Sequence, residues 1–197
     1  MGVQWYSGFH SHNVPLRDPG RLEPLWGDYT DSSGCAYGEF FATDVAGVHE
    51  VQAFYGSLVD TLYVSVMVYN PYLQWLPNHS TYQKVGTTPE HPTNFYGTFN
   101  AVSKIQTICS TFYNETRLVA GVNDMSLPWG GRFDLGPAYG GQWWHPPHHE
   151  HMWGLNADFP YQYLGTPTQR QRFRDIASAN GGNPQTEDNH YHLKFSH

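Results

Sequence analysis

The spacing of the apolar residues changes along this chain from a period of two to a period near 3.6, and this change most constrains the fold. Between Thr61 and Tyr69 one face carries an apolar residue at every second position: Leu62, Val64, Val66 and Val68. The segments 47–55 and 39–43 alternate in the same way, which predicts short, half-buried strands. After Gly97 the apolar residues recur at i+3 and i+4 as Phe99, Val102, Ile105, Ile108 and Phe112. That second pattern predicts an amphipathic helix with Thr98 as its N-cap.

A second helix and a final strand are predicted towards the C-terminus. Thr166 is followed by Pro167 and then by Gln169, which is the order of an N-cap, a first helical residue and a capping box. Gly181-Gly182 marks the end of this helix, and residues 190–195 read as a strand. The proline-containing segment 70–97 reads as linker and loop. The sequence therefore predicts two domains: an all-β sandwich over residues 1–70 and an α+β domain, with an antiparallel sheet and flanking helices, over 71–197.

Charge and hydropathy exclude two classes of partner. The formal net charge is −7 with only ten lysines and arginines, which argues against a nucleic-acid backbone as partner. The longest apolar run, Thr61–Tyr69, is far shorter than the ~20 residues of a membrane-spanning helix, so no transmembrane segment is expected. Aromatic residues reach 16% while charged residues are only 14%, a composition that suits a folded protein with glycan or protein partners.

The histidines indicate a metal site by their spacing. Seven of the twelve lie between His145 and His197, and imidazole is the commonest transition-metal ligand. His190 and His192 share one face of the predicted strand because they are two residues apart. His151 and Asp158 are seven residues apart, and a turn at Gly154 would bring them together. Two histidines and one aspartate would leave the fourth position of a catalytic zinc site open.

These residues carry a resemblance to a known superfamily. The pattern His151-x2-Gly154-x3-Asp158, followed by His190-x-His192, resembles the zinc peptidases that include lysostaphin-type endopeptidases, D-alanyl-D-alanine carboxypeptidases and penicillin-insensitive murein endopeptidases. The stretch 123–134, with Asn123-Asp124-Met125 at its start, and His148 resemble an uncharacterised bacterial branch of this superfamily. In that branch an immunoglobulin-like module precedes the peptidase domain, and the segment 31–68 with its AGVHEVQA motif is similar to such a module.

The resemblance implies a zinc ion bound by His151, Asp158 and His192, with His190 as the auxiliary catalytic residue. His148 is an additional imidazole that either acts in catalysis or lies at the surface. The carboxypeptidase branch has a glutamate three residues before the last ligand, where this chain has Asn189. The implied activity is hydrolysis of amide bonds in peptides, with peptidoglycan as the expected substrate.

Several alternatives stay open at this stage. A non-enzymatic secreted adhesion, wall-binding or filament-forming protein would share these features. Two glycosylation sequons, at Asn78 and Asn114, fit a secreted or cell-surface location. Core packing and a binding cleft are both open for a group of tryptophans: Trp129, Trp143, Trp144 and Trp153. The other open questions are whether Cys35 and Cys109 pair, whether His10 and His12 form a second metal site or lie at the surface, and whether Glu150, Glu187 and Asp188 are more than solvated loop charges.

Overall fold

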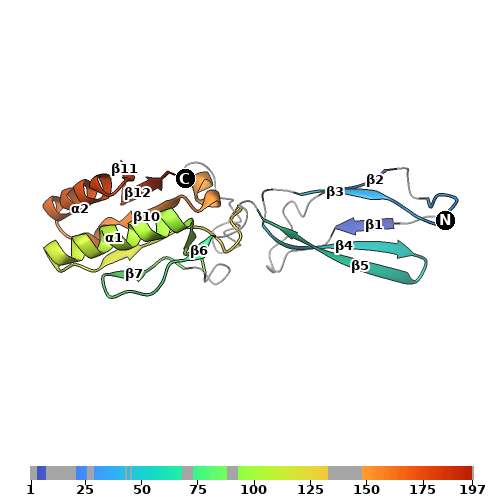
Figure 1. Cartoon of the computed structure of the whole chain (residues 1–197), viewed down its shortest axis with the longest axis horizontal. Coiled ribbons are helices and arrows are strands. Elements are labelled where there is room, and N and C mark those ends of the chain that lie inside the picture. The colour runs from blue at the N-terminus through green and yellow to red at the C-terminus, as the bar shows by residue number, and fades with distance from the viewer. Residues whose placement is uncertain are drawn as a thin grey trace. The chain divides into compact units, whose positions relative to one another are not determined.

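The fold is mixed α+β: among the described residues, eight strands precede the first α-helix and four more follow it, with two α-helices and several small sheets in all (Figure 1). The computed structural model describes residues 4–7, 21–25, 29–42, 44, 46–67, 73–87, 93–132 and 148–196, with side chains omitted at 4–7 and 148–150. The chain divides into two units, Met1–Val68 and Tyr69–His197. Neither α-helix of the described part has both the length and the apolar character needed to cross a membrane.

Unit 1 consists of antiparallel strands. Its elements are β1 (Gln4–Ser7), β2 (Arg21–Pro24), β3 (Gly38–Phe41), β4 (Gly47–Tyr55) and β5 (Leu58–Val66). They form one sheet in the order β1-β4-β5 and a second sheet of β2 and β3. Tyr55 pairs with Leu58 across a two-residue turn, and Gly56 has φ +59°, a backbone conformation that favours glycine.

The strand predicted at 47–55 is confirmed, whereas the one predicted at 61–69 begins earlier, at Leu58. Its expected buried face is only partly buried. Val66 is 7% exposed but Leu62 is 62% exposed, so this face of β5 is buried only at the end of the strand.

Unit 2 contains both helices and the larger core. Its elements are β6 (Gln74–Trp75), β7 (Tyr82–Lys84), β8 (Tyr96–Gly97), α1 (Phe99–Thr116), β9 (Ala120–Val122), the 3₁₀ helix η2 (His148–Trp153), β10 (Asn156–Pro160), the 3₁₀ helix η3 (Tyr161–Tyr163), α2 (Pro167–Ala179), β11 (Gly182–Thr186) and β12 (His190–Phe195). An antiparallel sheet has the order β10-β12-β11, β6 pairs antiparallel with β8, and β7 pairs parallel with β9.

Both helices begin where the sequence predicts. The Thr98 side chain accepts a hydrogen bond from the Ala101 backbone N–H, and Thr166 with Gln169 forms the complete capping box of α2. The apolar stripe of α1 is buried from Val102 to Phe112, but Phe99 in the first turn is 69% exposed. The two helices belong to the same unit (Figure 1). They pack against each other through Phe112 and Phe173, whose rings meet edge to face at 5.3 Å.

The segment read from the sequence as linker and loop is part of the core of unit 2, so that interpretation is wrong. Leu76, Tyr82 and Phe95 are at most 4% exposed and pack with α1 and α2 residues in one cluster. The segment has no apolar period because its strands are only two or three residues long. Single buried residues separated by loops therefore hold this segment in the core.

Neither cysteine forms a disulfide. Cys35 is exposed in unit 1, whereas Cys109 on α1 is buried in the core of unit 2. Burial raises the pKa of the Cys109 thiol above its usual value, because a thiolate is poorly solvated in apolar surroundings.

Candidate metal centre

The sheet of unit 2 places the last two residues of the predicted ligand set opposite one another. β10 and β12 pair antiparallel in a register that sets Asp158 directly against His192. His151 lies just before β10, in η2, and Gly154 turns the chain from η2 into the strand with φ +66°. A Cβ at Gly154 would lie 2.3 Å from Leu73 Cδ2 and 3.1 Å from the Gly97 backbone. Glycine is therefore required both for the turn and for its close packing.

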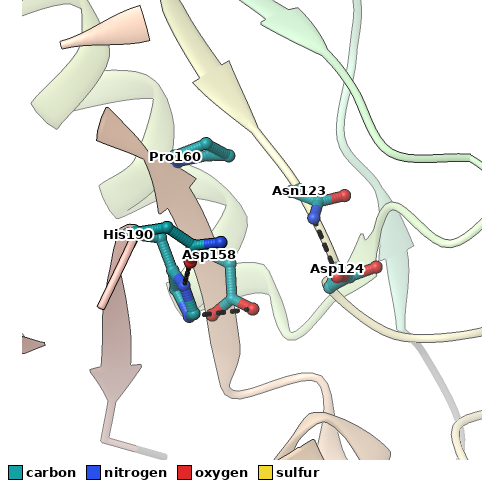
Figure 2. Close-up of a pocket in the computed structure, with 6 residues that line it drawn as sticks. Asn123, Asp124, Asp158, Pro160 and His190 are labelled. Carbon is teal, nitrogen blue, oxygen red and sulfur yellow. Dashed lines mark hydrogen bonds and ion pairs between the residues drawn. The ribbon is translucent and has the colours of Figure 1, made fainter. Parts of the chain in front are cut away.

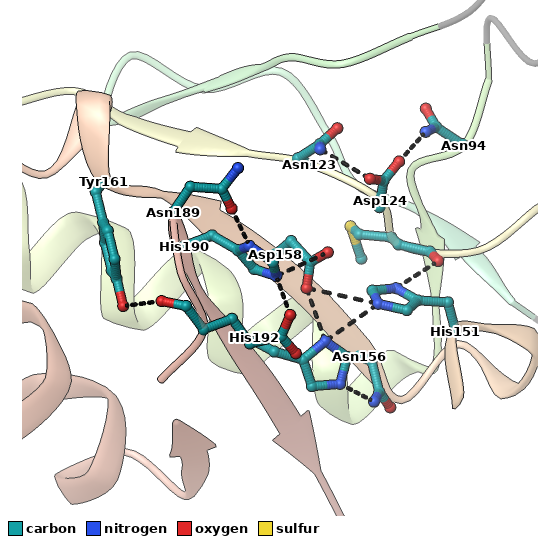
Figure 3. Close-up of polar contacts among 12 residues, drawn as sticks. Asn94, Asn123, Asp124, His151, Asn156, Asp158, Tyr161, Asn189, His190 and His192 are labelled. Carbon is teal, nitrogen blue, oxygen red and sulfur yellow. Dashed lines mark hydrogen bonds and ion pairs between the residues drawn. The ribbon is translucent and has the colours of Figure 1, made fainter. Parts of the chain in front are cut away.

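The three side chains converge on one point (Figure 3). Asp158 Oδ1 lies 2.8 Å from His192 Nδ1, and His151 Nε2 lies 3.2 Å from His192 Nδ1 and 3.5 Å from Asp158 Oδ1. An ion bound tetrahedrally at 2.0–2.1 Å needs ligand atoms about 3.3 Å apart. His151, Asp158 and His192 are thus a buried group that could hold a metal ion.

Other residues orient the two imidazole rings. His151 Nδ1 donates to the backbone carbonyl of Met125 at 3.1 Å, which directs Nε2 towards the ligand group. The carboxamide nitrogen Nδ2 of Asn156 lies 2.7 Å from His192 Nε2. Metal binding through Nδ1 requires the ring proton on Nε2, and half a turn of the carboxamide brings Oδ1 to the position where it accepts that proton. The sequence analysis assigned no role to Asn156. No sequence signal marked it, because β10 shows no alternation and the role depends on the register of β10 with β12.

An ion pair holds this group together without a metal. Burial alone would raise the pKa of Asp158, but the neighbouring His151, His192 and His190 outweigh burial and lower it. Burial would lower the pKa of His151, yet the charge and hydrogen bonding of Asp158 raise it. A metal ion must displace the proton that His151 retains, so metal affinity is expected to increase with pH.

His190 lies beside this group on the side of a cavity. Its Nε2 is 3.5 Å from Asp158 Oδ2 and 3.4 Å from Glu187 Oε2, while Nδ1 donates to Asn189 Oδ1 at 2.7 Å. Glu187 is therefore more than the solvated loop charge that was one interpretation of the sequence. Glu187, His190 and His192 form a second, overlapping group with metal-ligand spacing.

The cavity has a volume of about 250 Å³ and is lined by Asn123, Asp124, Asp158, Pro160, Asn189 and His190. Figure 2 shows Asp158 and His190 on one wall and Asn123 and Asp124 across from them. Burial and the negative charge of Asp158 raise the pKa of Asp124 to about 6. Sequence reasoning included Asp124 in the motif that carries the resemblance but gave it no role.

Other predicted residues are placed as follows. The side chains of His148 and Glu150, together with His10, His12, Trp143 and Trp144, lie outside the described residues. Trp129 is half-buried and Trp153 is 39% exposed. Asp188 is exposed, as a solvated loop charge would be.

No protein-family model and no curated protein matches this sequence. The class of protein is therefore defined by the fold and the site: an α+β protein with a buried His-Asp-His group that could hold a metal ion.

Proposed function

We propose that the protein is a zinc-dependent peptidase that hydrolyses amide bonds, with cell-wall peptides as its substrate. The observation that carries the proposal is the His151–Asp158–His192 triangle, whose Asp158 also forms part of a cavity wall. Two imidazole nitrogens and one carboxylate oxygen are a donor set typical of catalytic zinc, which keeps a further position for substrate or water. The resemblance to the lysostaphin and carboxypeptidase superfamily supports the same assignment, as well as an immunoglobulin-like unit 1 and a secreted or cell-surface location.

Each residue of the site would have a distinct role in the reaction. Bound zinc supplies a Lewis acid and activates water. His151, Asp158 and His192 bind the ion, and Met125 and Asn156 keep the two rings in the required orientation. His190 faces the cavity with Nε2, where it can take a proton from water and return it to the leaving amine. Asn189 fixes the proton on Nδ1 and so keeps Nε2 available.

A second candidate function is favoured by unit 1. Leu58, Leu62 and Tyr63 on the outer strand β5 are 62–68% exposed, and exposed apolar residues on a sheet edge suit contact with another molecule. A non-enzymatic adhesion, wall-binding or filament-forming protein would use this surface and need no hydrolysis.

The test measures metal content and hydrolysis together. We expect the wild type to bind about one zinc ion per chain and to release products from purified muropeptides, as followed by chromatography. His151→Ala should lose both properties, whereas His79→Ala, at an exposed histidine of the same unit, should lose neither. A wild type that binds no zinc contradicts the metal assignment. A zinc-loaded wild type without hydrolysis contradicts the peptidase assignment and favours the adhesion alternative.

A further inference from the structure

The cavity beside the metal group contains a carboxylate for which the proposed reaction has no use. Asp124 Oδ1 accepts a hydrogen bond from Asn94 Nδ2 at 3.0 Å, and Asp124 Oδ2 accepts one from Asn123 Nδ2 at 2.8 Å (Figure 3). Each carboxylate oxygen keeps a further acceptor site. The carboxylate is thus fixed in one orientation while part of its bonding capacity is unused.

Glycine and backbone geometry maintain this arrangement. A Cβ at Gly86, which has φ +77°, would lie only 1.8 Å from Asn123 Oδ1, so glycine makes room for the carboxamide that donates to Asp124. Asp124 itself has a left-handed backbone with φ 37°, which is uncommon for a residue with a side chain. Asn94 is 2% exposed. The position of the carboxylate is therefore determined by the fold.

Among the described residues, the favourable charge next to Asp124 is that of protonated His151, which also pairs with Asp158. The described hydrogen-bond partners of Asp124 are the two carboxamides, and no lysine or arginine is among them. The six residues that line the cavity include two carboxylates and no lysine or arginine. His190 Nε2, buried on the opposite wall, makes no hydrogen bond among the described residues. This nitrogen lies 3.5 Å from Asp158 Oδ2 and 3.4 Å from Glu187 Oε2, so the acceptors in and around the cavity are carboxylate oxygens. The cavity walls thus present acceptors and negative charge, which suit a ligand that brings donors and positive charge.

We propose that this cavity binds a primary ammonium group of the substrate, with Asp124 as its counter-ion. The inference rests on the proposed peptidase function and specifies its substrate class. At about 250 Å³ the cavity is smaller than the ~300–1,000 Å³ of sites that enclose a whole drug-sized ligand, so it takes one substituent of a peptide. Because Asp158 belongs to both the metal group and the cavity wall, the ammonium group lies next to the amide that is cleaved. It is either a free α-amino group or the amino group of a lysine-like side chain.

Matched peptides test the inference on the wild type. Four peptides of one sequence are compared, with the N-terminus free or acetylated and with lysine or acetyl-lysine next to the cleaved bond. We expect acetylation of one of these amines to lower kcat/KM by about 10- to 100-fold, the effect of losing one hydrogen bond between charged groups. The peptide pair that responds identifies the source of the ammonium group. Equal cleavage of all four peptides overturns the inference while leaving the peptidase function intact.

The variant Asp124→Asn provides a second test of the inference. We expect this variant to lose the same factor on the ammonium peptide, to lose much less on the acetylated peptide, and to keep its zinc content. Asp175→Asn removes one charge from the exposed surface of α2 and should behave as the wild type. An equal loss on both peptides in Asp124→Asn would contradict the assignment of Asp124 as counter-ion.

A binding measurement separates failure of this inference from failure of the proposed function. Calorimetric titration of the zinc-loaded full chain with n-butylammonium should give binding that Asp124→Asn weakens about tenfold or more. If no peptide is cleaved but this binding is observed, the peptidase function fails and the ammonium site stands. If peptides are cleaved and the amine does not bind the wild type, the ammonium site is overturned.

Discussion

Replacing Asp124 by asparagine should stabilise the metal-free protein at neutral pH. Burial first, and the negative charge of Asp158 second, raise the pKa of this carboxyl group from its ordinary value of 3.8 to about 6 in the folded protein. The folded protein therefore retains a proton that the unfolded chain releases in this range. The free energy of unfolding therefore falls as the pH rises from about 4 through 6, and it stays lower above pH 6.

The expected size of the effect follows from the shift in pKa. About two pKa units at 1.36 kcal/mol each give about 3 kcal/mol in the free energy of unfolding at pH 7.5. For unit 2, Tyr69–His197, that corresponds to about 10–15 °C in Tm. Asparagine fits the site because Asn123 Oδ1 and Asn94 Oδ1 make no hydrogen bond among the described residues. Rotation of either carboxamide would present an acceptor to the new N–H group. Asparagine also tolerates the left-handed backbone of this position.

The assay is urea unfolding of the full chain with a chelator, at pH 3.5 to 8, for the wild type, Asp124→Asn and the surface control Asp175→Asn. The difference between Asp124→Asn and the wild type should be near zero at pH 3.5 and reach its maximum above pH 7. Added zinc should reduce it, since a nearby positive charge favours the carboxylate. A variant no more stable than the wild type at pH 7.5, or a difference that does not vary with pH, would refute this account of Asp124.

Three further outcomes are expected. Asn156→Ala should weaken zinc binding about 10- to 100-fold in a chelator competition while the fold persists, because the ring of His192 loses its partner; unchanged affinity would show that Asn156 does not orient the ligand. Gly86→Ala should destabilise unit 2 by about 1–3 kcal/mol, since the added Cβ collides with the Asn123 side chain and the backbone has positive φ; thermal melts measure this, and no loss would mean that Asn123 moves freely. Thr166→Ala should cost about 1 kcal/mol through the lost cap of α2, and Thr166→Ser should restore it in the same melts.

The helices were predictable because their signals are local. Thr98 and Thr166 with Gln169 determine where α1 and α2 begin, and the caps depend only on residues within one turn. The strand β12 was predictable from its own residues, whereas its neighbours β10 and β11 were not. β10 is buried over four of its five residues, so no alternation marks it. β11 contains a glycine and a proline, which are rare in strands and are tolerated here because β11 is an outer strand of the sheet.

In the candidate site, too, the residues linked by a short spacing were predictable and those brought together by packing were not. His151, Asp158 and His192 could be proposed together because a motif spacing carries them. Asp124 and Asn94 could not be connected from the sequence, because their hydrogen bond joins positions 30 residues apart and depends on how two loops pack. Asn156 acquires its role only through the register of β10 with β12.

Each unit contains one free cysteine, so a thiol reagent can report on the two units separately. Cys35 is exposed, so it reacts in the native protein and records that the reagent is active. Cys109 lies at 0% exposure in the core of unit 2, and its raised pKa keeps it in the unreactive thiol form. Labelling of Cys109 therefore requires unit 2 to open, and its rate in native buffer reports the free energy of that opening. A single chain thus carries both the reporter and its internal reference without any engineered probe.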